Sequence, residues 1–327
     1  MGVKILSIGA WTPSKVLTNQ DLEKMVDTTD EWIRSKTGIC TRRIADKDTA
    51  TSDIGLNAAK IALERSGLNA EDLDMIIVAT ATPDFVGFPA TSCIIQGKLG
   101  AVNAGAFDLV AGCSGLAYSI EVARGLINNG NMKNILVMGA EKLSSIVNWE
   151  DRATCCLFGD GAGALILSEG DDSEGNIIDS IIKADGTGEA ALKILRGGSR
   201  FPIEDTLPPK ADRSLTMDGQ AVYNFAVRVN TEMVKELLER NNLTSDDLAW
   251  IVPHQANYRI IKAAGKRLKI DESKFFMNLE DYGNTSAASI GIALNEMHEK
   301  DLLKRGDYII TMGFGAGLTY AANLIKY

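Results

Sequence analysis

The hydrophobic residues of this chain fall into two kinds of segment that alternate along its length. Four short stretches are almost continuously apolar: 73–80, 134–140, 249–254 and 307–313. Runs of this length are typical of strands that are covered on both faces of a sheet. Between them lie longer stretches with helical periodicity, such as 51–66, which ends at Gly67. This alternation predicts an α/β fold.

The second half of the chain repeats the first. Residues 63–78 align without gaps to residues 238–253, with seven identities. Three further pairs follow in the same order: 111–117 with 282–288, 137–139 with 311–313, and 161–167 with 315–321. Four pairs in one order favour duplication over chance similarity. We therefore expect two similar halves, residues 1–170 and 171–327, which meet within the acidic stretch 169–176.

Composition narrows the class of protein. The 327 residues are 45% hydrophobic and 24% charged, as in a globular protein with an ample core. No apolar run approaches the ~20 residues of a membrane span, and the first residues carry no export signal. The five scattered cysteines favour a reducing cytoplasm over disulfides or a metal site, and the net charge of −9 disfavours nucleic acid. We expect a cytoplasmic protein with no metal and no membrane or nucleic-acid partner.

Cys113 stands where the apolar run 106–110 gives way to a helical pattern. The N-terminus of a helix carries about +0.5 charge, which can lower a thiol pKa from ~8.5 to between ~3.5 and 7.5. Neighbouring glycines let a backbone amide face a carbonyl oxygen. This context favours a nucleophile over the commoner role of a small buried hydrophobe. We assign that commoner role to the other cysteines: Cys40, Cys93, Cys155 and Cys156.

The duplication places two further residues near Cys113. Asn284 is its equivalent in the second half, and His254 ends a strand equivalent to 76–79. All three then lie at the carboxyl ends of strands, where open α/β folds place their sites. The alternatives are a turn or N-cap role for Asn284 and a structural role for His254.

The two glycine-rich strings do not indicate dinucleotide binding. GDGAGA (159–164) and GFGAGL (313–318) both run into strand-like sequence, whereas a dinucleotide loop leaves a strand and opens a helix.

A basic stretch follows His254. Residues 254–270 contain no acid, and four cations recur at helical spacing: Arg259, Lys262, Lys266 and Lys269. A solvated surface is the simplest explanation. In a chain of negative net charge, however, this face favours docking of an acidic partner.

At these residues the chain resembles the β-ketoacyl-acyl carrier protein synthase III family of the thiolase superfamily. The resemblance covers essentially the full length and rests on these segments: 21–39, GCSG around Cys113, 154–164, 253–260, 282–289 and the terminal GFGAGLT. PHQAN together with GNTSAAS is the most specific part. The resemblance implies a thiolase-like duplicated fold in which helices sandwich mixed β-sheets in layers. The first half then carries the nucleophilic cysteine, and the second carries the histidine and asparagine.

The resemblance also implies an activity. The family performs a decarboxylative Claisen condensation of a primer acyl-CoA, acetyl-CoA by default, with malonyl-acyl carrier protein, the initiating step of type II fatty acid biosynthesis. Cys113 then holds the acyl group, and His254 and Asn284 donate hydrogen bonds to the developing enolate. The CoA thioester is a substrate, so no cofactor is expected.

Several binding roles follow from the same resemblance. The backbone amides of Cys113 and Ala316, which stands where the family commonly has glycine, form a second oxyanion hole. The residues expected to bind CoA are Thr28, Trp32, Arg152 and Asn257. Those expected to meet the carrier protein are Gln255, Ala256, Asn257, Tyr258, Arg259, Lys262 and Lys266. The family is homodimeric, and Phe88 is expected to reach the partner's acyl pocket.

Three alternatives remain at this point. The order Cys, His, Asn also occurs in papain-like cysteine proteases, but their local signature is absent here. A sibling condensing enzyme could act in secondary metabolism or use CoA-bound malonyl donors. A non-catalytic scaffold is hard to reconcile with an intact triad.

Overall fold

The first half of the chain is built on a five-stranded mixed sheet in the computed structural model, which describes residues 2–170, 175–203 and 209–327. In spatial order its strands are β1 (Gly2–Trp11), β7 (Gly161–Gly170), β6 (Asn134–Glu141), β4 (Met75–Ala79) and β5 (Gly105–Leu109). The pairs β1–β7 and β7–β6 are antiparallel, whereas β6–β4 and β4–β5 are parallel.

The second half repeats this arrangement in a four-stranded sheet. Its strands, in the equivalent order, are β8 (Asn176–Ala184), β13 (Thr319–Lys326), β12 (Tyr308–Gly315) and β11 (Leu248–Pro253). The pairs run antiparallel, antiparallel and parallel, as in the first sheet. A single parallel bridge between Ile251 and Phe275 stands in the place of β5. The four apolar runs form β4, β6, β11 and β12, so the prediction that they are strands is confirmed.

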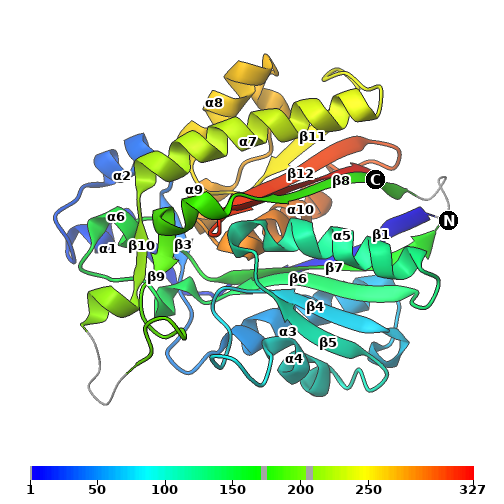
Figure 1. Cartoon of the computed structure of the whole chain (residues 1–327), viewed down its shortest axis with the longest axis horizontal. Coiled ribbons are helices and arrows are strands. Elements are labelled where there is room, and N and C mark those ends of the chain that lie inside the picture. Colours follow the sequence, from blue (N-terminus) through cyan, green and yellow to red (C-terminus); the bar gives the residue numbers. More distant parts are fainter. Residues whose placement is uncertain (1, 171–174, 204–208) are drawn as a thin grey trace.

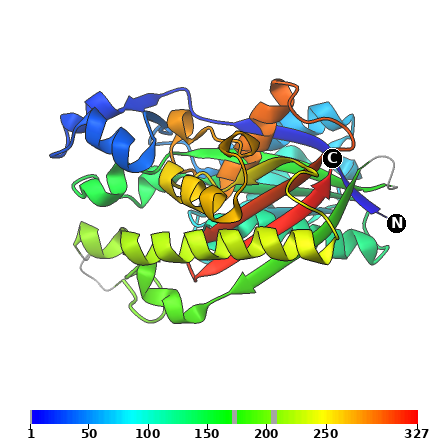
Figure 2. The same cartoon turned by 90° about the horizontal axis from the view of Figure 1, so that it is seen from above.

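Helices and sheets alternate in layers, as expected (Figures 1 and 2). Two helices lie between the sheets: α5 (Gly115–Asn128) and α10 (Ser289–Glu299). Four helices cover the outer faces: α3 (Thr51–Ser66) and α4 (Thr91–Leu99) on the first sheet, α7 (Gly219–Arg240) and α8 (Tyr258–Leu268) on the second. The predicted end of α3 is confirmed, because Gly67 takes a left-handed φ of 72° there.

Shorter elements surround one end of the layers. The helices are α1 (Asn19–Glu23), α2 (Asp30–Thr37), α6 (Arg152–Cys155) and α9 (Leu279–Tyr282). Two ribbons pair β2 (Val16–Thr18) with β3 (Thr41–Arg43), and β9 (Leu192–Ile194) with β10 (Leu215–Met217). Within the described ranges, no helix combines the length and the apolar character needed to cross a membrane.

The largest shared core lies between the two sheets. Ile77 on β4 and Leu116 on α5 pack there with Ile290 on α10 and Ile309 on β12. Because all four side chains are fully buried, this core joins the two halves through the hydrophobic effect.

The junction expected at residues 170 and 171 falls between two strands. β7 ends at Gly170 and β8 begins at Asn176. Residues 171–174 of the expected junction lie outside the described residues, so the division into 1–170 and 171–327 stays a prediction.

One contact brings the first sheet unusually close to a central helix. Gly163 on β7 meets Gly291 on α10 backbone to backbone: a Cβ on Gly291 would lie 2.7 Å from the Cα of Gly163. Both sides of the contact are backbone atoms, which cannot move aside as the end of a flexible side chain could. The contact therefore sets how closely the first turns of α10, which begin at Ser289, approach the sheet.

The substitution Gly291→Ala tests this contact. Alanine favours a helix over glycine by ~1 kcal/mol, but overpacking a rigid site costs ~1–3 kcal/mol or more. We expect a net loss of about 1–2 kcal/mol in the free energy of unfolding, measured by chemical denaturation. The matched control is Gly125→Ala on α5, where a Cβ meets no atom within 4 Å. This control should gain roughly 0.5–1 kcal/mol; equal effects at the two glycines would contradict the account.

Candidate active site

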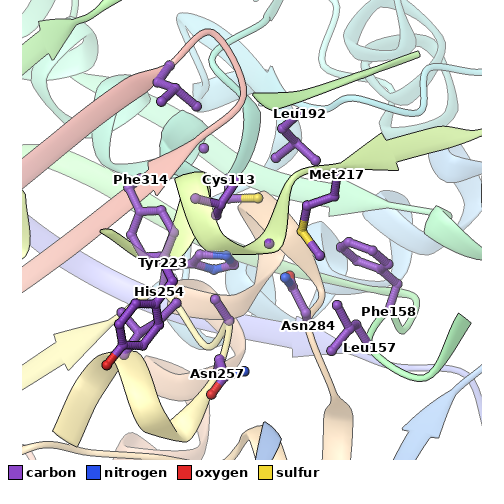
Figure 3. Close-up of a pocket in the computed structure, with 16 residues that line it drawn as sticks. Cys113, Leu157, Phe158, Leu192, Met217, Tyr223, His254, Asn257, Asn284 and Phe314 are labelled. Carbon is purple, nitrogen blue, oxygen red and sulfur yellow. The ribbon is translucent and has the colours of Figure 1, made fainter. Parts of the chain in front are cut away.

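One cavity brings Cys113, His254 and Asn284 together (Figure 3). Its volume is about 130 Å³. The cysteine comes from the first half of the chain, and the histidine and asparagine come from the second. Large apolar side chains form much of the wall, including Leu157, Phe158, Leu192, Met217, Phe314 and Leu318. The three residues that the duplication placed at strand ends thus face one enclosed space.

Cys113 lies in the single turn of 3-10 helix Gly112–Ser114 that leads into α5, so the predicted strand-to-helix turn is confirmed. Its environment nevertheless differs from the expectation. Burial raises the pKa of the thiol to about 12, and a hydrogen bond with Ser286 offsets only part of this rise. The lowered pKa expected at this turn is therefore not found, because the loss of solvent disfavours the thiolate. Cys113 rests as a neutral thiol.

The turn at Cys113 packs against the turn between β12 and β13. A Cβ on Gly315 would lie 2.3 Å from the amide nitrogen of Cys113, and one on Gly112 would lie 2.7 Å from that of Ala316. Thr319 Oγ1 also donates to the Ala111 carbonyl at 2.7 Å. The backbones that carry the amides of Cys113 and Ala316 are therefore in direct contact.

His254 follows the last residue of β11 and is buried. Its Nδ1 lies 2.7 Å from Ser289 Oγ, which also accepts a hydrogen bond from the Gln255 amide at 3.3 Å. Burial lowers the pKa of the imidazole to about 3. The ring is therefore neutral at physiological pH, and it packs edge-on against Phe314 with 5.4 Å between ring centroids.

Asn284 is held by its backbone and by one end of its side chain. Its amide donates to the Leu157 carbonyl at 2.8 Å, and its own carbonyl accepts from Gly159 at 3.0 Å. The side-chain Oδ1 accepts from the Ser286 amide at 2.8 Å. This bond leaves the Nδ2 group, which is purely a donor, to face the cavity.

Two residues that the sequence analysis missed lie behind Cys113. Glu141, at the end of β6, is fully buried, and Ser286 has a left-handed φ of 49°, which is uncommon for a residue other than glycine. The signals were present but weak. Glu141 is the single acid at the end of the apolar run 134–141, and Ser286 follows Asn284 by two positions.

Three of the residues expected to bind CoA form a group outside the cavity. The Arg152 guanidinium on α6 lies 4.9 Å from the ring centroid of Trp32 on α2. The Thr28 hydroxyl lies beside the Cys156 thiol. The fourth, Asn257, lines the cavity instead and donates to the Lys36 carbonyl at 3.0 Å. The adenine and pantetheine roles of these residues stay predictions.

The basic segment divides into exposed and buried residues. Arg259, Lys262 and Lys266 are exposed on α8, whereas Lys269 follows its last turn. Ala256 and Tyr258 are half-buried.

Gln255 requires a correction. Only 1% of its surface is exposed, and its amide group bonds the carbonyls of Pro253 and Phe276. The expectation that Gln255 contacts a carrier protein is therefore wrong. Its side chain instead ties down the loop after β11, where a buried amide must find internal partners.

The segment around Phe88 is uncovered in the single chain. Phe88 and Val86 are each 88% exposed, and Val110, just beyond the edge strand β5, is 82% exposed. Large apolar side chains that are this exposed are typical of a protein interface.

No group of three or more His, Cys, Asp or Glu side chains that could hold a metal ion occurs within residues 2–170, 175–203 and 209–327.

A duplicated layered fold with a cysteine, a histidine and an asparagine on one cavity defines the class: a condensing enzyme of the thiolase fold, an acyltransferase.

The comparisons with known proteins agree. Two family models match the chain. The model of 3-oxoacyl-[acyl-carrier-protein (ACP)] synthase III matches residues 107–186, and the model of the C-terminal part of that family matches residues 238–327. The β-ketoacyl-[acyl-carrier-protein] synthase III of Caldanaerobacter subterraneus subsp. tengcongensis is 53% identical over 99% of this chain and 97% of its own. The chain belongs to the β-ketoacyl-[acyl-carrier-protein] synthase III family.

Solved structures support the same assignment. The 3-oxoacyl-[acyl-carrier-protein] synthase III of Aquifex aeolicus superposes with a TM-score of 0.91 and 43% identity, and the match covers 100% of both chains. The priming β-ketosynthase of the R1128 polyketide biosynthetic pathway gives a TM-score of 0.91 and 35% identity over 99% of this chain and 96% of its own. The predicted thiolase-like fold is thereby confirmed.

Proposed function

We propose that this enzyme condenses a primer acyl-CoA, acetyl-CoA by default, with malonyl-acyl carrier protein to give 3-oxoacyl-acyl carrier protein, CO2 and CoA. This is the initiating step of type II fatty acid biosynthesis. The observation that carries the proposal is the single cavity onto which Cys113, His254 and Asn284 open from both halves of the chain. The names of its relatives support it.

In the first half-reaction, the sulfur of Cys113 attacks the thioester carbonyl of the primer, and CoA leaves. The tetrahedral intermediate carries negative charge on oxygen. The backbone amides of Cys113 and Ala316, on two turns in direct contact, are suited to donate to that oxygen. The alanine at position 316 keeps the amide donor that the family's glycine supplies.

In the second half-reaction, malonyl-acyl carrier protein loses CO2 and leaves an enolate, which attacks the acyl group on Cys113. His254 and Asn284 donate hydrogen bonds to the enolate oxygen. In this step Ser289 Oγ donates to Nδ1 of His254, and the ring proton then stands on Nε2, where it can reach the enolate oxygen. Two neutral donors suit this step, because decarboxylation itself generates the carbanion and no base is needed to create it.

CoA and the carrier protein approach from the side of α2, α6 and α8. Trp32 and Arg152 would hold the adenine between a ring and a planar guanidinium. Thr28 and Asn257 would contact the rest of CoA. The exposed cations Arg259, Lys262 and Lys266 would meet the acidic carrier protein.

The cavity supports a short primer. Large side chains such as Phe158 and Met217 narrow the cavity, which favours a small acyl group. The exposed Phe88 supports a homodimer in which this ring reaches the partner's acyl pocket. The proposal includes a cytoplasmic location, supported by five free cysteines, and no cofactor besides the substrate thioester.

The first test follows the condensation product. Purified enzyme with acetyl-CoA and malonyl-acyl carrier protein should release CO2 and form 3-oxoacyl-carrier protein, measured by mass spectrometry of the carrier. Cys113→Ala should abolish product, because no thiol remains to hold the acyl group. Cys93 is an exposed free thiol, so the buried role expected for it is wrong. Cys93→Ala is therefore the control and should leave turnover unchanged. Thioester hydrolysis without condensation would contradict the proposal.

The second test separates carrier-protein recognition from catalysis. Arg259→Glu should lower kcat/KM for malonyl-acyl carrier protein at least about tenfold and leave malonyl-CoA turnover unchanged, because the lost contact belongs to the carrier. Lys60→Glu, on the exposed side of α3 in the opposite outer layer, makes the same change of charge and should have no effect. An equal loss of kcat/KM with malonyl-acyl carrier protein and malonyl-CoA would mean that Arg259 binds CoA or stabilises the fold. A wild-type enzyme that prefers malonyl-CoA would instead favour the sibling condensing enzyme.

A further inference from the structure

A second cavity lies apart from the catalytic one, and the reaction described above does not use it. Its volume is about 560 Å³, within the range of ~300–1,000 Å³ that is usual for ligand sites. It lies between the β2–β3 ribbon and the turn Leu143–Ser145 that follows β6. Among the described residues, its lining and that of the cavity at Cys113 have no member in common.

Much of the lining of this second cavity is apolar. Leu17 on β2, Ile44 next to β3 and Trp149 contribute to it, together with Met25 just beyond α1. Met25 is 48% exposed, so water reaches the apolar wall. An apolar ligand that covered this wall would release that water and gain the hydrophobic effect.

The walls are held in place by buried and half-buried groups. The carboxylate of Asp160 accepts hydrogen bonds from the Ala45 amide at 2.8 Å and from the Ser144 amide at 2.9 Å. The ammonium group of Lys142 donates to the backbone carbonyls of residues 46, 47 and 49. Both sets of bonds join the segment after β3 to the segment after β6. The cavity is therefore formed before a ligand enters, which lowers the entropic cost of binding.

Three lysines and no acid are found in the described lining of the second cavity: Lys15, Lys47 and Lys142. Lys15 and Lys47 are exposed, and no carboxylate in the described parts of the chain pairs with either ammonium group. Asp46 and Asp48, the acids nearest in sequence, line a neighbouring cavity instead. The rim is thus positive in a chain whose net charge is −9, and it favours an anion.

The neutral polar side chains of the lining have already used their donors. Ser144 Oγ donates to the Asp160 carboxylate at 2.6 Å, and Ser145 Oγ donates to the Lys142 carbonyl at 2.7 Å. Trp149 Nε1 donates to the Ser144 carbonyl at 3.3 Å. Among these side chains, the lysines are left as the donors that a ligand can use. A nucleotide base or a sugar needs more directional partners than this, whereas an aliphatic chain needs none.

We propose that this second cavity binds a fatty acid anion, with its aliphatic chain on Leu17, Met25 and Trp149 and its carboxylate between Lys15 and Lys47. The inference goes beyond the proposed function and does not depend on it, because it concerns a separate site. Chain and carboxylate match the two properties of the lining, an apolar wall and an unpaired positive rim.

The test is the binding of decanoate to the purified full-length enzyme, measured by isothermal titration calorimetry at low ionic strength. Decanoate should bind about three- to tenfold more tightly than 1-decanol, because two exposed lysines attract its carboxylate. This difference should vanish in ~1 M salt, where the Debye length falls to about 3 Å.

Matched variants locate the site. Met25→Glu should weaken decanoate binding at least about tenfold, because it removes apolar surface and places a negative charge beside the ligand. Val16→Glu is the control: Val16 is 40% exposed on the same ribbon, but it precedes Leu17 and points to the opposite face. It should leave the affinity unchanged. Lys15→Gln combined with Lys47→Gln should reduce the affinity for decanoate to that for 1-decanol.

Acetylation of Cys113 by acetyl-CoA shows that each variant is folded. Equal affinities of the wild-type enzyme for decanoate and 1-decanol, or equal losses in Met25→Glu and Val16→Glu, would overturn the proposal. Met217→Glu, in the catalytic cavity, should leave decanoate binding intact. Its loss there would place the ligand in the catalytic cavity, and binding of adenosine diphosphate that Met25→Glu abolishes would make the second cavity a nucleotide site; either result contradicts the proposal.

Discussion

The site depends on one backbone contact, between the turn that carries Cys113 and the turn that joins β12 to β13. Any side chain at Gly315 would overlap the amide of Cys113, and one at Gly112 would overlap that of Ala316. At this point the two halves of the fold meet backbone to backbone, with no side chain between them. This contact fixes the position of Cys113 relative to the amide of Ala316. It also places Cys113 and Gly315 together in the lining of the cavity.

Burial then decides the chemistry that this arrangement can perform. It keeps the Cys113 thiol and the His254 imidazole neutral, since it disfavours the charged form of each group. The cavity consequently offers hydrogen-bond donors in fixed positions and no ionised base. Such a site suits the stabilisation of transient oxyanions, which is the requirement of acyl transfer and of decarboxylation alike.

The sequence predicted the duplication, the strands and the convergence of Cys113, His254 and Asn284, because a repeat places equivalent residues at equivalent strand ends. Other features depend on three-dimensional context that spacing does not carry. Gln255 lies between the buried His254 and the half-buried Ala256, and its side-chain amide is held by the carbonyl of Phe276. The protonation of Cys113 follows from its burial, which spacing does not reveal.

The central claim is that the two half-reactions use different donors: the backbone amides of Cys113 and Ala316 serve acylation, and the side chains of His254 and Asn284 serve condensation. It is tested most directly by measuring the half-reactions separately in Asn284→Ala. The account predicts that acetyl-CoA still acylates Cys113 at nearly the wild-type rate, while CO2 release from malonyl-acyl carrier protein falls by about 10²–10³-fold, the usual cost of losing one oxyanion donor. Loss of acylation with decarboxylation intact would contradict it.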